Sequence, residues 1–292
     1  MPRPVALVSA SEARHHDSDL PFLVRALGDR GIVADIVDWD APVDWARYQV
    51  AIIRSTWDYH RRLDEFMEWV DRVSTITTLL NPPEVIRWNT DKRYLGELAE
   101  AKIAVIPTTY VSSDVELDEA KFNGLLDGDV VVKPTVSAGS NDTERHQSSP
   151  ETASRHIAAL VAARKVAMVQ PYQRFIDDNG ETGMLFFNGE YSHAFRKGAI
   201  LATGDNVKNG LFVEEDIGTR EPNDQERALG EKILRYVTRK FGEAPLYARV
   251  DVVRGSAGTP VLMELEMTEP SLFVHVSPGS AERFAAAVVA RR

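Results

Sequence analysis

The chain has 292 residues, of which 43% are hydrophobic and 27% are charged, a composition typical of globular proteins and not of disordered or fibrous ones. Its 34 Lys and Arg residues stand against 44 Asp and Glu residues, which gives a formal net charge of −10 and disfavours a nucleic acid or an anionic membrane surface as partner, because both would repel the chain. Cysteine is absent, so disulfides, thiolate nucleophiles and Cys-ligated zinc are excluded.

Strands and helices alternate over residues 1–88, which predicts a parallel α/β domain. Buried strands are expected at residues 5–8, 32–37 and 50–53, and amphipathic helices at residues 20–27 and 63–70. Ligands of such sheets bind at the carboxyl ends of the strands, where this chain has Ser9, Ser55, Thr56 and Asp58. Thr56 and Asp58 also fit a simple cap of the helix that follows.

The Asn-Pro-Pro sequence at residues 81–83 breaks this pattern and predicts a boundary near residue 88. A helix should follow, with Lys92 in its first turn. Strands at 129–133 and 166–169 and a helix at 150–164 are then expected to form a small α+β unit.

A polar loop at residues 135–143 follows the apolar strand at 129–133, which ends at Lys133. A lysine at the end of an apolar strand is well placed to meet a phosphate, and small residues such as Ser137, Gly139 and Ser140 let backbone N–H groups approach anionic oxygens. The same residues also fit a solvated lysine before an ordinary surface loop. Neither a P-loop nor a dinucleotide-binding GxGxxG sequence is present.

The C-terminal part of the chain, residues 169–292, is rich in predicted strands. The Asn-Gly pair at 188–189 predicts a hairpin. Helices are expected at 223–241 and 280–290, and a closing hairpin is expected from strands at 246–253 and 260–267.

The closing hairpin holds the most informative residues. Strand periodicity places Arg249 and Asp251 on one face of the first strand, and Glu264 and Glu266 on one face of the second. Three carboxylates without Cys or His suit a hard cation such as Mg²⁺ or Mn²⁺, and an adjacent Arg suits a terminal phosphoryl group. The spacing alone fits a solvated strand face with charge pairs equally well.

The register of this hairpin follows from its turn. If Arg254 pairs with Thr259, then Arg249 lies opposite Glu264. Asp251 would then be the diagonal neighbour of Glu264, at about 7–8 Å.

These residues form an ordered set that resembles the ATP-grasp superfamily from about residue 89 onward. The set consists of Lys92, Lys133 with its loop, Gln170-Pro171-Tyr172, Arg249-Val250-Asp251 and Glu264-Leu265-Glu266. The resemblance implies an ATP-grasp fold with an N-terminal parallel α/β domain at 1–88 that binds substrate, a lid subdomain at 89–168 and a C-terminal ATP- and Mg²⁺-binding subdomain at 169–292.

The resemblance also implies a role for each member of the set. Lys92 and Lys133 would contact the nucleotide phosphates, together with the loop of Ser137, Gly139 and Ser140. Gln170, Pro171 and Tyr172 would form the hinge that faces adenine, largely through backbone groups. Arg249 would meet the γ-phosphate, while Asp251, Glu264 and Glu266 would hold Mg²⁺, with Mn²⁺ as the alternative ion. The family often has Glu-x-Asn where this chain has Glu-x-Glu, so Glu266 adds a charge.

Three further residues fit the resemblance less directly. Arg196 and Lys197 look like the basic pair that faces the transferred phosphate or acyl group in relatives, and they also fit an exposed basic pair. Glu181 fits a contact with ribose or a turn residue.

Residues 54–59 and 264–273 resemble the small glutathione-synthetase-like group, and within it the cyclo-ligases that convert O-ureido-D-serine to the antibiotic D-cycloserine. This resemblance implies that ATP phosphorylates a substrate carboxylate and that an amine-type nucleophile then displaces phosphate, with loop 135–143 as a lid that excludes water. Substrate specificity would come from Ser9, Ser55, Thr56 and Asp58, of which Asp58 could hold a substrate ammonium group.

Three other functions remain open on the sequence alone. They are an intermolecular carboxylate–amine ligase, a ligase that extends a protein tail, and an ATP-binding module without chemistry. The joint presence of Lys133, Arg249, Asp251 and Glu264 favours catalysis over sensing, because a sensor needs no complete metal-binding face.

The expected partners are ATP and a small amino-acid-like carboxylate, and a homodimer is left open. No apolar run approaches the ~20 residues that a membrane helix needs, and the N-terminus does not resemble a signal peptide, so we expect a cytoplasmic protein. The seven histidines show neither an HExxH sequence nor a paired ligand spacing, and each is expected to be a surface or core residue.

Overall fold

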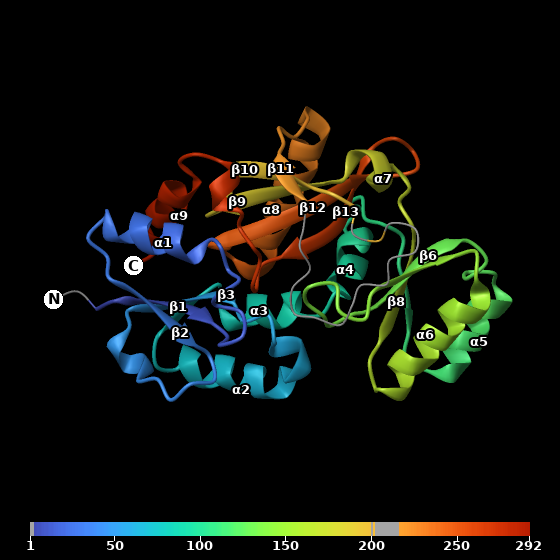
Figure 1. Cartoon of the computed structure of the whole chain (residues 1–292), viewed down its shortest axis with the longest axis horizontal. Helices are drawn as coiled ribbons and strands as arrows, with labels where there is room; N and C mark the ends of the chain where they lie inside the picture. The colour runs from blue at the N-terminus through green and yellow to red at the C-terminus, as the bar shows by residue number, and fades with distance from the viewer. Residues whose placement is uncertain (1–2, 200, 202–215) are drawn as a thin grey trace.

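A computed structural model describes residues 3–199, 201 and 216–292. Over this part of the chain the fold is mixed α/β, with an N-terminal sheet, a small sheet and a central sheet (Figure 1). Figure 1 shows the N-terminal sheet and the small sheet toward opposite ends of the molecule, with the central sheet spanning the two. No helix among the described residues is long and apolar enough to cross a membrane.

The N-terminal sheet is fully parallel, with strand order β2-β1-β3-β4. Its strands are β1 (Val5–Ser9), β2 (Ala34–Asp38), β3 (Val50–Ser55) and β4 (Thr78–Leu80), and its helices are α1 (Leu20–Gly28), α2 (Leu63–Ser74) and α3 (Pro83–Asn89). The predicted strands and both amphipathic helices of this region are confirmed. β4 was not predicted, because three residues are too short to show a period.

The small sheet is antiparallel, with strand order β5-β8-β6-β7. Its elements are β5 (Thr109–Val111), α5 (Asp114–Phe122), β6 (Asp129–Pro134), β7 (Glu144–Gln147), α6 (Pro150–Ala162) and β8 (Ala167–Pro171), preceded by α4 (Tyr94–Glu100). α5 and α6 cover the face of the sheet that is turned away from the rest of the chain (Figure 1). β6 ends beside Lys133 as predicted, whereas α5 and β7 were not predicted.

The central sheet is antiparallel, with strand order β11-β10-β9-β12-β13. Its strands are β9 (Glu181–Phe187), β10 (Glu190–Lys197), β11 (Ile217–Thr219), β12 (Tyr247–Arg254) and β13 (Pro260–Glu266), and its helices are α7 (Phe175–Asn179), α8 (Asp224–Phe241) and α9 (Ser280–Val289). α8 begins where predicted because Asn223 and Glu226 form a capping box, and it ends at Gly242, whose φ of 83° suits glycine.

The central sheet is joined to the N-terminal sheet by a shared apolar core. This core includes Leu7 of β1, Leu23 of α1, Leu185 of β9 and Phe284 of α9. Helices α1 and α9 lie side by side in Figure 1 and pack against each other. The first and last helices of the chain therefore help fix the orientation of the N-terminal sheet relative to the central sheet.

The predicted register of the closing hairpin is wrong. Arg254 pairs with Pro260, so the turn is one residue longer than expected, and a bulge places Val252 opposite Leu262 but Asp251 opposite Glu264. The bulge inserts one more residue into β13 before the acidic pair. Asp251 therefore lies directly across from Glu264, and Arg249 lies across from Glu266.

Candidate active site

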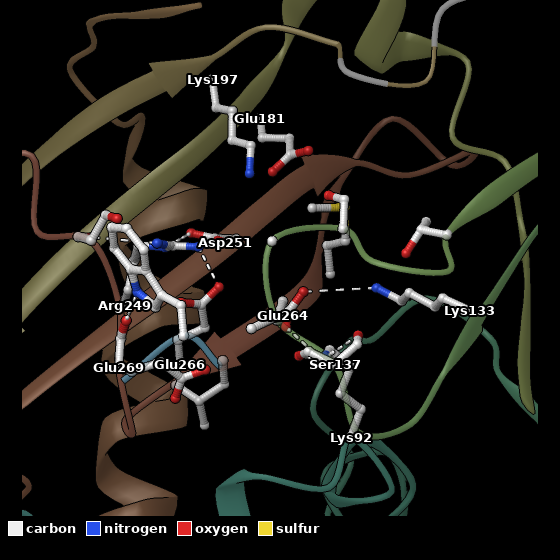
Figure 2. A pocket seen from close by; sticks show the side chains of 18 of the residues that line it. Lys92, Lys133, Ser137, Glu181, Lys197, Arg249, Asp251, Glu264, Glu266 and Glu269 are labelled. Atoms are coloured by element: carbon white, nitrogen blue, oxygen red, sulfur yellow. Dashed lines mark hydrogen bonds and ion pairs between the residues drawn. The ribbon is translucent and has the colours of Figure 1, made fainter. Parts of the chain in front are cut away.

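A cavity of about 760 Å³ is lined by residues of all three sheets or of the loops that follow their strands. The N-terminal region contributes Trp57 and Tyr59, the small-sheet region contributes Lys133, and the central sheet contributes Arg249 and Glu264. Figure 2 shows that the charged side chains point into a common space between these elements. The cavity thus gathers residues that are more than 200 positions apart in the sequence.

Glu264 lies between two lysines of the small-sheet region. Its carboxylate is 3.2 Å from Lys92 Nζ and 3.7 Å from Lys133 Nζ (Figure 2). Burial alone would raise the pKa of Glu264, but the charges of Lys92, Lys133 and Arg249 outweigh burial and lower the pKa to about 2. Glu264 is therefore ionised at neutral pH.

Lys92 and Lys133 are held differently. Lys92 precedes α4 and donates a hydrogen bond to the backbone oxygen of Ser137 at 2.8 Å, so it also fixes the start of the loop. Burial lowers the pKa of Lys133, and the carboxylate of Glu264 opposes that effect. Both lysines face Glu264 in the cavity and are positioned to bind another anion there.

Arg249 gathers the other two carboxylates of the predicted metal site. Its Nε and Nη2 donate to Asp251 at 3.0 and 2.8 Å, and its guanidinium also pairs with Glu266. Burial raises the pKa of Glu266 to about 7; the charge of Arg249 opposes this increase, and the charges of Glu264 and Asp251 add to it. Arg249 thus offsets part of the repulsion among the carboxylates, and the raised pKa of Glu266 shows that part of the repulsion remains.

The acidic side chains form two groups, Glu264 with the lysines and Asp251 and Glu266 with Arg249 (Figure 2). As a donor set, three carboxylates without a nitrogen ligand fit Mg²⁺. The register places Asp251 and Glu264 on directly opposed positions, and both residues line the cavity.

The predicted nucleotide-binding residues also line the cavity. They are Lys92, Lys133, Ser137, Gly139, Ser140, Gln170, Pro171, Tyr172 and Glu181. The side chain of Gln170 donates to Thr108 Oγ1 at 2.9 Å, so it ties β8 to the segment before β5. Contact of Gln170, Pro171 and Tyr172 with a nucleotide stays a prediction, since the structure shows only that they line the cavity.

Five predicted site residues are absent from the described lining of the cavity, namely Ser9, Ser55, Thr56, Asp58 and Arg196. The hydroxyls of Ser9 and Ser55 lie 2.8 Å apart and are fully buried. Asp58 accepts hydrogen bonds from Trp39 Nε1 at 3.0 Å and from Arg62 at 2.6 Å. Lys197 does line the cavity, whereas its neighbour Arg196 pairs with Asp216. Direct contact of these five residues with a ligand remains a prediction.

Glu269 and Tyr59 also line the cavity, although neither was predicted as a site residue. The two side chains hydrogen-bond to each other. Burial is the main cause that raises the pKa of Glu269 to about 8, and the negative charge of nearby Glu266 adds to the increase. Glu269 lies beyond the end of β13, so strand periodicity could not place it, although residues 264–273 had carried the family resemblance.

Replacing Glu269 with glutamine should flatten the pH dependence of stability. The pKa of Glu269 is raised by folding, so the free energy of unfolding falls as pH rises from the unfolded value near 4.5 through about 8. At about 1.4 kcal/mol per pKa unit, this one carboxyl accounts for a fall on the order of a few kcal/mol. Glu269→Gln removes that fall because the amide does not ionise.

Urea unfolding at pH 6 and pH 9 in the presence of EDTA measures this effect. The exposed Glu282 provides the control, since Glu282→Gln should leave the pH dependence as it is in the unmodified chain. Equal pH dependence in Glu269→Gln and the unmodified chain would show that Glu269 does not keep its proton.

Comparison with known proteins identifies the fold. The ATP-grasp ligase PsnB, complexed with minimal precursor, Mg and ADP, superposes with a TM-score of 0.64 at 16% identity, over 98% of this chain and 97% of that one. The N-terminal parallel sheet and the two antiparallel sheets that meet at a charged cavity are therefore those of an ATP-grasp protein. Ligases of this class use ATP, and Mg and ADP are bound in that relative.

Matches at higher sequence identity define the family. The cycloserine biosynthesis protein DcsG of Streptomyces lavendulae is 38% identical over 295 residues, which cover 98% of each chain. The crystal structure of D-cycloserine synthetase DcsG superposes with a TM-score of 0.91 at 36% identity, over 98% of this chain and 99% of that one. Residues 5–81 match the family model of the N-terminal domain of D-cycloserine synthetase DcsG. The chain belongs to the DcsG family of ATP-grasp ligases.

Proposed function

We propose that this protein is the ATP-dependent cyclo-ligase that closes O-ureido-D-serine to D-cycloserine. The observation that carries the proposal is the cavity in which Lys92, Lys133 and Arg249 surround the acidic face of the closing hairpin. The name of the DcsG relative, which aligns over nearly the whole chain, supports the choice of product. The proposal retains the division into a substrate domain at 1–88, a lid at 89–168 and an ATP-binding subdomain at 169–292.

The chemistry that the cavity supports is activation of a carboxylate. A carboxylate is a poor electrophile because attack adds charge to an anion, and conversion to an acyl phosphate supplies a leaving group. Lys92 and Lys133 bind the phosphates, and Arg249 neutralises charge on the transferred phosphoryl group. Asp251, Glu264 and Glu266 would hold Mg²⁺, or Mn²⁺ with the same ligand preference, and the ion would supply further neutralisation of the phosphates.

Ring closure then uses a nucleophile of the same molecule. The nitrogen bonded to the side-chain oxygen attacks the acyl phosphate and expels phosphate, and tethering makes this step efficient. The product also lacks the carbamoyl group of the substrate, which water removes as carbamate. Water must still be kept from the acyl phosphate, and loop 135–143 would exclude it as a lid. The position of Ser137, Gly139 and Ser140 in the cavity wall supports this role.

Release of ADP with O-ureido-D-serine as the single carboxylate tests the proposal. D-cycloserine should appear with ADP and phosphate, and hydroxylamine should trap the acyl phosphate. A requirement for a second amine would instead show an intermolecular ligase. Binding of ATP without turnover across a panel of amino-acid-like carboxylates would show a module without chemistry, and turnover without ADP would contradict the acyl-phosphate route.

A further inference from the structure

Two histidines and a glutamate meet on the small sheet, outside the cavity described above. Glu144 and His146 belong to β7, and His156 belongs to α6. Within the part of the chain that the structure describes, one potential ligand atom from each lies within 4.8 Å of the other two. None of the three lines the active-site cavity, so the cluster is a separate feature of the fold.

The spacing of the three atoms suits a tetrahedral metal ion. His146 Nε2 is 3.2 Å from His156 Nδ1, and Glu144 Oε2 is 3.8 and 3.9 Å from these nitrogens. Zinc–nitrogen bonds of about 2.0–2.1 Å in a tetrahedral site place two nitrogens roughly 3.3 Å apart. The histidine pair therefore needs almost no movement, and the carboxylate needs to move by roughly 0.5 Å. The side chain of Glu144 is 44% exposed and has room to do so.

The hydrogen bonds around His146 direct a nitrogen lone pair into the cluster. Thr152 Oγ1 donates its single proton to the backbone oxygen of Ser149 at 3.0 Å. It therefore accepts from His146 Nδ1, which is also 3.0 Å away. With its proton on Nδ1, His146 turns the lone pair of Nε2 toward His156 Nδ1. A hydrogen bond to the second ring nitrogen is the usual support of a histidine that binds a metal.

His146 is buried and His156 is partly buried, and burial lowers the pKa of both rings. Neutral imidazoles are the form that binds metal. A backbone hydrogen bond with Asp142 also connects His156 to the end of loop 135–143.

We propose that Glu144, His146 and His156 form a binding site for a borderline divalent metal of the Zn²⁺ class, distinct from the carboxylate site for Mg²⁺. Two nitrogens and one oxygen suit such an ion, whereas Mg²⁺ prefers oxygen ligands alone. Three protein ligands leave the fourth position to water. The bound ion links β7 to α6 immediately after loop 135–143, and through Asp142 it stabilises the base of that loop.

Titration of the nucleotide-free full chain with Zn²⁺, in excess Mg²⁺ to occupy the carboxylate site, tests this proposal. We expect one equivalent of Zn²⁺ by calorimetry, a higher Tm with Zn²⁺, and visible absorption bands of four-coordinate Co²⁺ when Co²⁺ replaces it. His146→Gln and His156→Gln should each lose all three signals. Glu144→Gln should weaken Zn²⁺ binding by at least about tenfold, since one of three protein ligands is lost.

His15→Gln is the matched control, because His15 is exposed and belongs to a different sheet region; it should bind Zn²⁺ as the unmodified chain does. Circular dichroism tests whether each variant is folded. The rise of Tm with Zn²⁺ is measured on the unmodified chain, so this test does not depend on the folding of any variant. Absence of Zn²⁺ binding would show that the histidines form only a hydrogen bond. Binding that survives in both histidine variants would place the ion elsewhere, and either result overturns the proposal.

Discussion

Replacing Glu264 with glutamine should lower kcat by roughly 10³-fold or more while the chain stays folded, a loss comparable to removal of a strong electrostatic stabiliser of a transition state. The pKa of Glu264 is lowered to about 2, so the substitution removes a full negative charge at neutral pH. Glu264 is also the carboxylate that lies across from Asp251 and between Lys92 and Lys133. The variant should therefore lose Mg²⁺-dependent turnover.

The affinity for ATP in the absence of metal should not fall in this variant. In Glu264→Gln the two lysines lose their shared carboxylate partner, so a phosphate becomes their best available anion. We expect metal-free ATP to bind at least as tightly as in the unmodified chain, and added Mg²⁺ to strengthen that binding much less. Steady-state kinetics and calorimetry measure the two effects, with the exposed Glu190→Gln as the control. Turnover close to normal at saturating Mg²⁺ would contradict the role of Glu264 as a metal ligand.

The sequence predicted the elements of this site better than their register. Lys133 and the carboxylates were found because strand period and strand ends are local properties of the chain. The pairing of β12 with β13 depends on a bulge and on a longer turn, and neither leaves a clear mark in the sequence. Asp251 was therefore expected diagonal to Glu264 and lies directly opposite it.

The residues that were missed depend on contacts between distant segments. Glu269 is paired with Tyr59, which is 210 positions earlier in the sequence. His146 and His156 meet because α6 packs behind β7, and their spacing of ten residues matches no local ligand pattern. Burial and packing of this kind are set by the whole fold, so a single sequence gave no signal for them.

The residues predicted to bind substrate also show that the sequence does not predict contacts between distant segments. Ser9 and Ser55 were expected at strand ends, and they are there, but their hydroxyls face each other beneath the surface. The residues that reach the cavity from this side come two or more positions after the strand end, as Trp57 and Tyr59 do. Position at a strand end therefore predicts the neighbourhood of a site more reliably than it predicts contact.

Asp19→Ala should destabilise the chain by about 3–5 kcal/mol, the range for removing one partner of a buried ion pair. Asp19 immediately precedes α1, but its carboxylate binds a segment near the C-terminus, residues 272–274. It accepts hydrogen bonds from the backbone N–H groups of Leu272 at 2.6 Å, Phe273 at 3.1 Å and Val274 at 2.8 Å. It also lies 3.9 Å from the fully buried guanidinium of Arg54.

The alanine variant leaves these donors without an acceptor, and each unsatisfied buried donor costs about 1–3 kcal/mol. Asp29→Ala, at an exposed position just after α1, should change stability little and is the control. Urea unfolding measures both variants, and a loss below about 1 kcal/mol in Asp19→Ala would show that water replaces the carboxylate. Phe273 lines the active-site cavity, so the same substitution should raise KM for the carboxylate substrate. One buried carboxylate would thereby couple the stability of the N-terminal sheet to the shape of the site.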